Sequence, residues 1–168
     1  MNRETITFGK YEWLILDIKD DCALLLSKDI IAEMPYHEEW EDITWKECSL
    51  REWLNTEFLN SFTEQEQVRI MLKTQKNEES LSLCTLGYDT KDKIFLLSPE
   101  EVDQYFSNSE HRISRFNNKP SFWWLRSASC RDIDATHVDA DGSVHTLGFL
   151  LRNGSGGVRP ALWLNLKS

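Results

Sequence analysis

Two arginines lie within apolar segments near the end of the sequence, and they raise the first question of chemistry. Arg126 and Arg159 are both flanked by large apolar residues. A guanidinium in such surroundings must be paired or hydrogen-bonded, because an isolated buried charge is very costly. Its planar fork could clamp a carboxylate or another anion. We favour the structural interpretation, in which both arginines hold backbone carbonyls or pair with Asp132, Asp134 or Asp139 and so lock the final strands.

Aspartates cluster around the dipeptide Asp141-Gly142, and several carboxylates close together can bind calcium. The EF-hand pattern is not met, because His137 stands at its first position and Gly148 at its last. The lectin calcium signatures are also absent. We therefore expect no metal here, and we interpret Asp141 and Gly142 as structural residues of a hairpin turn that needs positive φ angles.

A thiol, an imidazole and a carboxylate could form a nucleophilic triad from Cys130, His137 and Asp134 or Asp139. Such triples arise by chance in a chain with four cysteines and four histidines. The four cysteines include no CxxC pair, which disfavours a structural zinc site, and we expect reduced thiols and no cofactor.

Tryptophan is abundant, with seven in the chain, and exposed rings can stack on sugars or peptides. Trp13, Trp53 and Trp163 fit the apolar periodicity of their segments and are predicted to lie in the core. Trp123 and Trp124 are adjacent, so on a strand they point to opposite faces. We expect one of them to be buried and the other to face outward or lie under a loop.

The polar, aromatic segment 35–41 is the best place in the sequence for an exposed ring. It contains Tyr36, His37 and Trp40. Together with Trp124, these residues are our candidates for a ligand-binding groove.

The elements that would position these residues follow a simple order. Apolar runs at 6–8, 11–18 and 22–27, separated by short polar turns, predict a three-stranded antiparallel meander. Ser49, Thr63 and Ser98 each precede a glutamate by three positions, a capping box that predicts the start of a helix. Segments 73–92 and 107–120 are polar and are predicted to be loops.

The last third of the chain returns to strands. A buried strand is predicted at 93–97, an aromatic strand at 122–127, a hairpin over 136–146 and a final strand at 158–164. Strands, then helices, then strands, without βαβ alternation, predict an α+β fold in a single domain over residues 1–168.

Composition excludes several classes of protein. The formal charge is −9 at pH 7, which disfavours nucleic-acid binding because phosphate recognition needs a basic surface. No apolar run reaches the roughly 18 residues that span a bilayer, and no signal peptide is evident, so we expect no membrane partner and a cytoplasmic location.

Four blocks of the sequence resemble one bacterial and phage domain family of unknown function. They are 49–60 (SLREWLNTEFLN), 93–106 (KIFLLSPEEVDQYF), 122–127 (FWWLRS) and 157–162 (GVRPAL). The family often has Pro-Gly after WLRS, where this chain has Ala128 and Ser129. In order of elements the family is similar to the C-type-lectin-like fold, which includes the sulfatase-modifying domains and phage tropism determinants. The resemblance therefore implies a C-type-lectin-like α+β scaffold.

Three functional hypotheses remain open. The leading one is a non-enzymatic recognition module that binds a protein or a glycan. The alternatives are an enzyme, or an enzyme relic, with a pocket near Arg126, His137 and Arg159, and a structural or assembly domain whose oligomeric state the sequence does not reveal.

Overall fold

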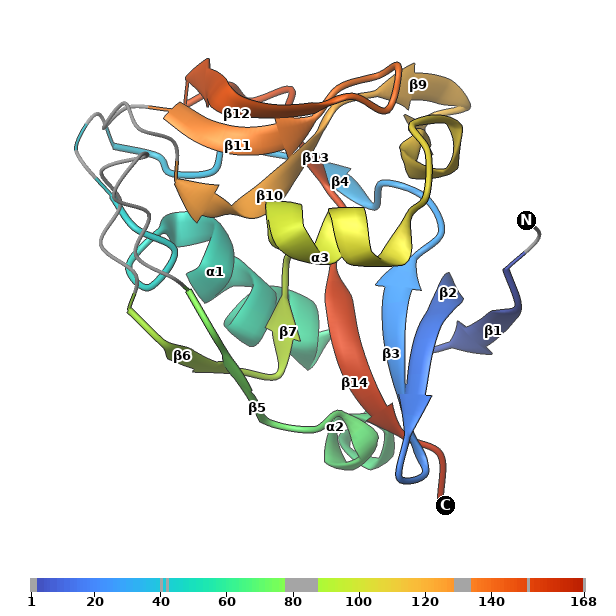
Figure 1. The fold of residues 1–168 in the computed structure, drawn as a ribbon. Coiled ribbons are helices and arrows are strands. Elements are labelled where there is room, and N and C mark those ends of the chain that lie inside the picture. Colours follow the sequence, from blue (N-terminus) through green and yellow to red (C-terminus); the bar gives the residue numbers. More distant parts are fainter. Residues whose placement is uncertain are drawn as a thin grey trace.

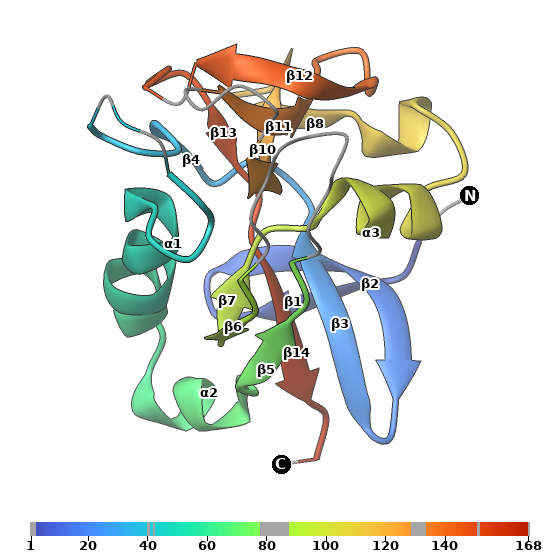
Figure 2. The same ribbon diagram turned by 60° about the vertical axis from the view of Figure 1, so that its left-hand side comes forward.

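The computed structural model describes residues 3–39, 41, 43–77, 88–128, 134–150 and 152–167. Within these ranges the chain forms two five-stranded sheets, two short two-stranded ribbons and short helices, which is an α+β architecture as predicted (Figure 1). Figure 2 shows helices α1 (Ser49–Trp53) and α3 (Pro99–Tyr105) on opposite sides of the strands between them.

Sheet A begins with the predicted meander. Its strands are arranged β1-β2-β3-β14-β7, and every neighbouring pair is antiparallel. The two residues that join β2 to β3, Asp20 and Asp21, both have positive φ, which is the geometry of a tight two-residue hairpin. The bounds of the strands are β1 (Thr5–Phe8), β2 (Tyr11–Lys19), β3 (Cys22–Ser27), β7 (Ile94–Phe95) and β14 (Ala161–Asn165).

Sheet B is built mostly from the C-terminal third. Its order is β12-β11-β10-β13-β4, with β10 and β13 parallel and the other pairs antiparallel. The predicted hairpin is present as β11 and β12. The bounds of the strands are β4 (Ala32–Glu33), β10 (Trp123–Ala128), β11 (Asp134–Val138), β12 (Val144–Leu150) and β13 (Gly157–Val158).

The predicted final strand at 158–164 is wrong in one respect, because the chain divides it between the two sheets. Strand β13 ends in sheet B, and β14 begins in sheet A after Arg159 and Pro160. Proline has no N–H to donate to a ladder, so it suits a point where a strand leaves one sheet for another. Its carbonyl still accepts a 2.9 Å hydrogen bond from the Ser27 amide of β3.

Two of the three predicted capping boxes are confirmed. Thr63 caps α2 (Glu64–Arg69) and Ser98 caps α3, each with the reciprocal glutamate bond. The box at Ser49 is wrong by one residue, since the thiol of Cys48 caps α1. Ser49 is already helical, and its hydroxyl instead accepts a hydrogen bond from the Glu38 amide.

The two segments predicted as loops contain short ribbons. Strands β5 (Lys73–Gln75) and β6 (Thr90–Asp92) pair antiparallel. Within 107–120 lie the 3-10 helix η2 (Glu110–Arg112) and strands β8 (Ser114–Phe116) and β9 (Lys119–Ser121). Polar composition concealed these elements because both ribbons are short and partly exposed.

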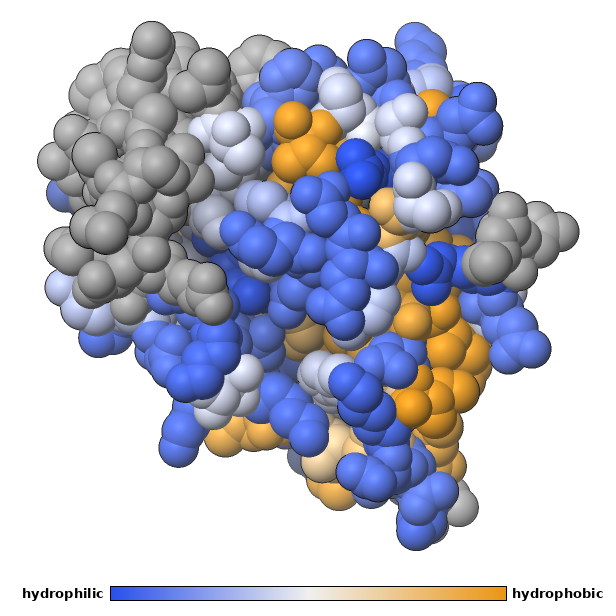
Figure 3. All heavy atoms as spheres, in the orientation of Figure 1, coloured by the Kyte–Doolittle hydropathy of each residue, from blue (hydrophilic) through white to orange (hydrophobic). Residues whose placement is uncertain are grey.

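Hydrophobic residues on the face drawn in Figure 3 gather beside strands β2 and β3, below α3. The rest of that face is largely hydrophilic. The core itself lies between the sheets and helices, and Trp13 is buried in it as predicted. Trp53 and Trp163 are only partly buried and pack against that core.

Candidate functional site

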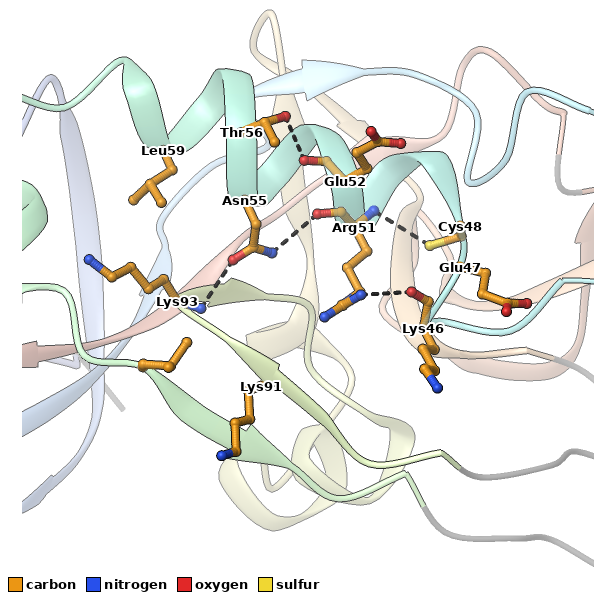
Figure 4. Close-up of a pocket in the computed structure, with 11 residues that line it drawn as sticks. Lys46, Glu47, Cys48, Arg51, Glu52, Asn55, Thr56, Leu59, Lys91 and Lys93 are labelled. Carbon is orange, nitrogen blue, oxygen red and sulfur yellow. Dashed lines mark hydrogen bonds between the residues drawn. The ribbon is translucent and has the colours of Figure 1, made fainter.

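A groove of about 630 Å³ lies between helix α1 and the ribbon of β5 and β6 (Figure 4). We call it the helix–ribbon groove. Its helical wall consists of Arg51, Glu52, Asn55, Thr56 and Leu59, which recur at the three- and four-residue spacing of one helix face. The wall is continuous because the π-helix η1 (Leu54–Phe58) follows α1 directly. Single turns of π-helix often occur at functional sites.

The ribbon side of the helix–ribbon groove is basic. Lys91 and Lys93 lie there together with the half-exposed Leu72, and Lys46 lies at the end next to α1. The ammonium group of Lys46 stands 5.2 Å from the centre of the Tyr88 ring. A basic wall is unusual in a chain whose net charge is −9.

Arg51 is fixed at the centre of the groove by two strong hydrogen bonds. Its Nε donates to Asp92 Oδ1 at 2.7 Å, and its Nη1 donates to the Lys46 carbonyl at 2.7 Å. Its third nitrogen, Nη2, has no hydrogen-bond acceptor among the residues that the structure describes, and 25% of the side chain is exposed. Arg51 therefore presents a held, charged donor to the open groove.

Asp92 is the buried anchor of that arrangement. Its other oxygen, Oδ2, accepts hydrogen bonds from Trp45 Nε1 at 3.0 Å and Thr90 Oγ1 at 2.7 Å. Its side chain has no exposed surface, so the ion pair with Arg51 compensates a desolvated charge. The pair also ties strand β6 to helix α1 across 41 residues of sequence.

Asn55 joins the helical wall of the groove to strand β7 by hydrogen bonds. Its Oδ1 accepts from the amides of Lys93 and Ile94, and its Nδ2 donates to the carbonyls of Arg51 and Ile94. The Lys93 ammonium donates to the Gln67 carbonyl at 2.9 Å. These groups are used in holding the walls together, which leaves Arg51, Lys46 and Lys91 to face a ligand.

The cysteine beside the groove is not a nucleophile. Cys48 is buried, its sulfur donates to the Trp45 carbonyl, and it accepts the Arg51 amide as the cap of α1. Burial raises the pKa of this thiol to about 12, so it stays protonated at neutral pH. Thiol reactivity requires the thiolate.

The aromatic candidates from the sequence do not form an accessible groove. Tyr36 and Trp124 are both fully buried and meet edge to face, with ring centres 6.0 Å apart. The Tyr36 hydroxyl donates to the Arg126 carbonyl, and Trp124 Nε1 donates to the Met34 carbonyl. In this conformation neither ring is open to a ligand.

His37 and Trp40 are the other two ligand-binding candidates in segment 35–41. His37 is almost fully buried, with Nδ1 accepting the Ser49 amide at 3.1 Å and Nε2 lying 3.0 Å from Glu41 Oε1. It therefore joins this loop to the start of α1. Trp40 lies outside the described residues.

Neither Trp123 nor Trp124 faces outward, and the other expected alternative, a ring under a loop, is met by Trp124, whose Nε1 donates to the Met34 carbonyl of the loop after β4. Both are fully buried because β10 is covered on both faces. Trp123 packs under Arg159, whose guanidinium carbon lies 4.8 Å from the centre of its ring. Trp124 packs against Tyr36 and Phe122 on the opposite face.

Arg126 and Arg159 are both buried and both hold carbonyls, which are the contacts that the structural interpretation requires. Arg126 also forms a 3.0 Å ion pair with Glu101. Of the aspartates predicted as its partners, Asp132 and the side chain of Asp134 lie outside the described residues. Arg159 donates to the carbonyls of Ser27, Lys28 and Arg112. Burial lowers the pKa of Arg159 to about 9, so its guanidinium stays charged at neutral pH.

Asp141 and Gly142 form the turn between β11 and β12. The Asp141 carboxylate accepts hydrogen bonds from the amide and hydroxyl of Ser143. Of the two, only Gly142 has positive φ, at +84°, so the loop is longer than the predicted tight turn. The Asp141 carboxylate therefore has a structural role within its own turn.

The described contacts of the residues of the alternative pocket lead to different partners. Among the described residues, Arg126 and Arg159 share no hydrogen-bond partner, and His137 lies on β11 with its ring stacked 5.2 Å from that of His145. Of the suggested triad, Cys130 and the side chain of Asp134 lie outside the described residues. No three potential metal ligands meet within the described ranges.

Sequence reasoning missed both Arg51 and Asp92. Arg51 was noted only as part of a predicted cap, and Asp92 fell in a predicted loop. A signal was present in the alternation of Thr90 and Asp92 immediately before the apolar run 94–97, since side chains two apart on a strand share a face.

Within the described residues, the protein has an α+β fold, and the helix–ribbon groove has a basic wall. The chain belongs to a family described as a domain of unknown function, DUF6273, which it matches over residues 20–166. Comparison with curated proteins and with solved structures finds no significant match. In the ranges that the structure describes, no helix combines the length and apolarity needed to cross a membrane.

Proposed function

We propose that this protein is a non-enzymatic recognition module whose ligand binds in the helix–ribbon groove. The observation that carries the proposal is the Nη2 group of Arg51, which is held in place by Asp92 and the Lys46 carbonyl and still lacks a partner among described residues. A donor that is fixed in advance costs little further ordering when a ligand binds.

The chemistry of the groove supports binding over catalysis. The only thiol among its described lining residues, Cys48, is buried and protonated, and the amide of Asn55 uses both of its polar atoms to join the helix to β7. No histidine is among the described residues that line the groove. A general base within reach of a nucleophile is what acid–base or covalent catalysis would need.

A protein ligand is favoured over a glycan by the lining of the groove. None of the described residues that line it is aromatic, so they offer no ring for a sugar to stack on. Their side chains include four cations, two glutamates, one amide, one hydroxyl and two leucines. This mixture suits the alternating charged and apolar side chains of a peptide.

We also propose that the scaffold is C-type-lectin-like and that the protein is cytoplasmic. Support for the scaffold is the order of elements, with an N-terminal strand pair, intervening helices and a C-terminal strand that returns to β3.

Peptide and glycan arrays probed with the folded protein test the proposed function. The variant Thr56→Trp places a large ring on the exposed helical wall of the groove, and Thr146→Trp makes the same change on β12, away from it. We expect the wild type and Thr146→Trp to retain the same peptides and Thr56→Trp to lose them, with unchanged circular dichroism. Retention of those peptides by Thr56→Trp, or the absence of any bound ligand, contradicts the proposal.

A further inference from the structure

We infer that the ligand of the helix–ribbon groove is a short acidic peptide segment, whose carboxylate binds Arg51 and whose apolar side chain lies on Leu59 and Leu72. The inference rests on the proposed function, because it specifies the ligand class of the same groove.

The first step is the geometry at Arg51. Figure 4 shows its side chain reaching from α1 into the space between Lys46 and Lys91. Nε and Nη1 are already bonded, so Nη2 is the donor that remains, and an oxyanion bound to it would lie in a groove that Lys46 and Lys91 also line. Charge-assisted hydrogen bonds of this kind are about twice as strong as neutral ones.

The second step is the local balance of charge. Four cations, Lys46, Arg51, Lys91 and Lys93, line the groove against two glutamates, Glu47 and Glu52. The rest of the molecule is strongly acidic. A long polyanion such as a nucleic acid would be repelled beyond the groove, whereas a short segment with one carboxylate would meet the net positive charge of the groove.

The third step is the apolar end. Leu59 lies on the helical wall eight residues after Arg51, and Leu72 is 59% exposed where it lines the same groove. At about 1.5 Å per residue, the distance along the helix is roughly 10–12 Å. An extended peptide covers that distance with about three residues at roughly 3.3 Å each. The groove therefore suits an acidic residue and an apolar residue three positions apart, with two residues between them.

Blocked tetrapeptides test the inference directly. The probes are acetyl-Glu-Gly-Gly-Leu-amide and acetyl-Leu-Gly-Gly-Glu-amide, with the corresponding glutamine peptides as neutral controls, because the structure does not fix the direction of the chain. Binding is followed by NMR from the amide signals of Asn55, Thr56 and Lys91. We expect one acidic peptide to bind at least about fivefold more tightly than its neutral counterpart, and to weaken as salt is added.

Matched variants locate the interaction. The double variant Lys46→Gln with Lys91→Gln removes two exposed charges that hold no described wall contact, and we expect it to weaken the acidic peptide by about fivefold or more. Lys119→Gln, an exposed lysine of β9, should leave the affinity unchanged. Leu72→Ser should weaken both the acidic and the neutral peptide.

The inference is overturned if the glutamine peptides bind equally well, or if Lys119→Gln weakens binding as much as the double variant. It is also overturned if inorganic phosphate alone binds Arg51 more tightly than either acidic peptide. If the arrays show ligands in the groove that carry no acidic group, the inference fails and the proposed function stands. If Thr56→Trp changes no binding, both fail.

Discussion

At the scale of single residues, two arginines of the same chain differ in how completely their nitrogens are used. Arg126 donates from Nε, Nη1 and Nη2 to Asn77, to Glu101 and to two backbone carbonyls, and it is buried. Arg51 uses only two nitrogens and is a quarter exposed. The first arrangement leaves nothing for a ligand and holds the chain together, whereas the second leaves a donor in an open groove.

The role of Arg126 can be tested by replacing it with methionine, which has a similar length and no charge. Arg126→Met leaves the Leu96 carbonyl buried without its donor and Glu101 without its cation, so we expect a loss of about 2–4 kcal/mol in the free energy of unfolding. Thermal or urea unfolding followed by circular dichroism measures it. Arg152→Met changes an exposed arginine in the same way and should stay within about 0.5 kcal/mol of wild type. Equal stability of the two variants would refute the structural role.

At the scale of elements, the turn between β11 and β12 depends on one glycine. Gly142 has a φ of +84°, and a Cβ built on it would lie 1.9 Å from the Ser109 carbonyl oxygen. Gly154 offers a matched control, because a Cβ there would meet nothing within 4 Å. We expect Gly142→Ala to destabilise the protein by about 2 kcal/mol or more, through backbone strain and the clash, and Gly154→Ala to be nearly neutral. Chemical denaturation of both variants measures their free energies of unfolding. A Gly142→Ala variant as stable as the wild type would contradict this account of the turn.

An element can be predicted from the sequence when the residues that determine it lie close together in the chain. The caps at Thr63 and Ser98 and the hairpin at Asp141-Gly142 are decided by residues within a few positions, and the sequence predicts them. The division of the last strand at Pro160 and the pairing of β5 with β6 depend on partners far along the chain. The helix–ribbon groove also depends on residues far apart in the chain, because its central ion pair joins Arg51 to Asp92. The cap of α1 shows the limit even locally, since the thiol of Cys48 replaced the hydroxyl that pattern favours.

At the scale of the whole molecule, the chain crosses repeatedly between its two sheets, and buried polar side chains fasten the crossings. Arg159 lies where the chain passes from β13 to β14, and it holds the carbonyls of Ser27 and Lys28 at the end of β3. Arg126 fastens β10 of sheet B to the segment before α3. Trp123 and Trp124 fill the space on both faces of β10, so two of the seven tryptophans pack around this strand. The stability of the fold is therefore sensitive to any change in the charge of groups buried in sheet B.

His137 is a buried titratable group of sheet B, and its pKa predicts that the protein loses stability in acid. Burial, followed by the neighbouring His145, lowers the pKa of His137 from 6.5 to about 4, while the carboxylate of Asp139 opposes that shift. The unfolded chain therefore takes up this proton near pH 6.5 and the folded protein only near pH 4, so this contribution to stability is complete above pH 6.5 and is lost as the pH falls toward 4. The full size of this contribution is about 3 kcal/mol.

Urea unfolding from pH 7 to 4 should show the free energy of unfolding falling with pH. His137→Gln should reduce this pH dependence, whereas His111→Gln, outside the β11–β12 hairpin, should keep it. A His137→Gln variant that loses stability with the wild-type slope would show that other groups, and not this histidine, govern the response to acid.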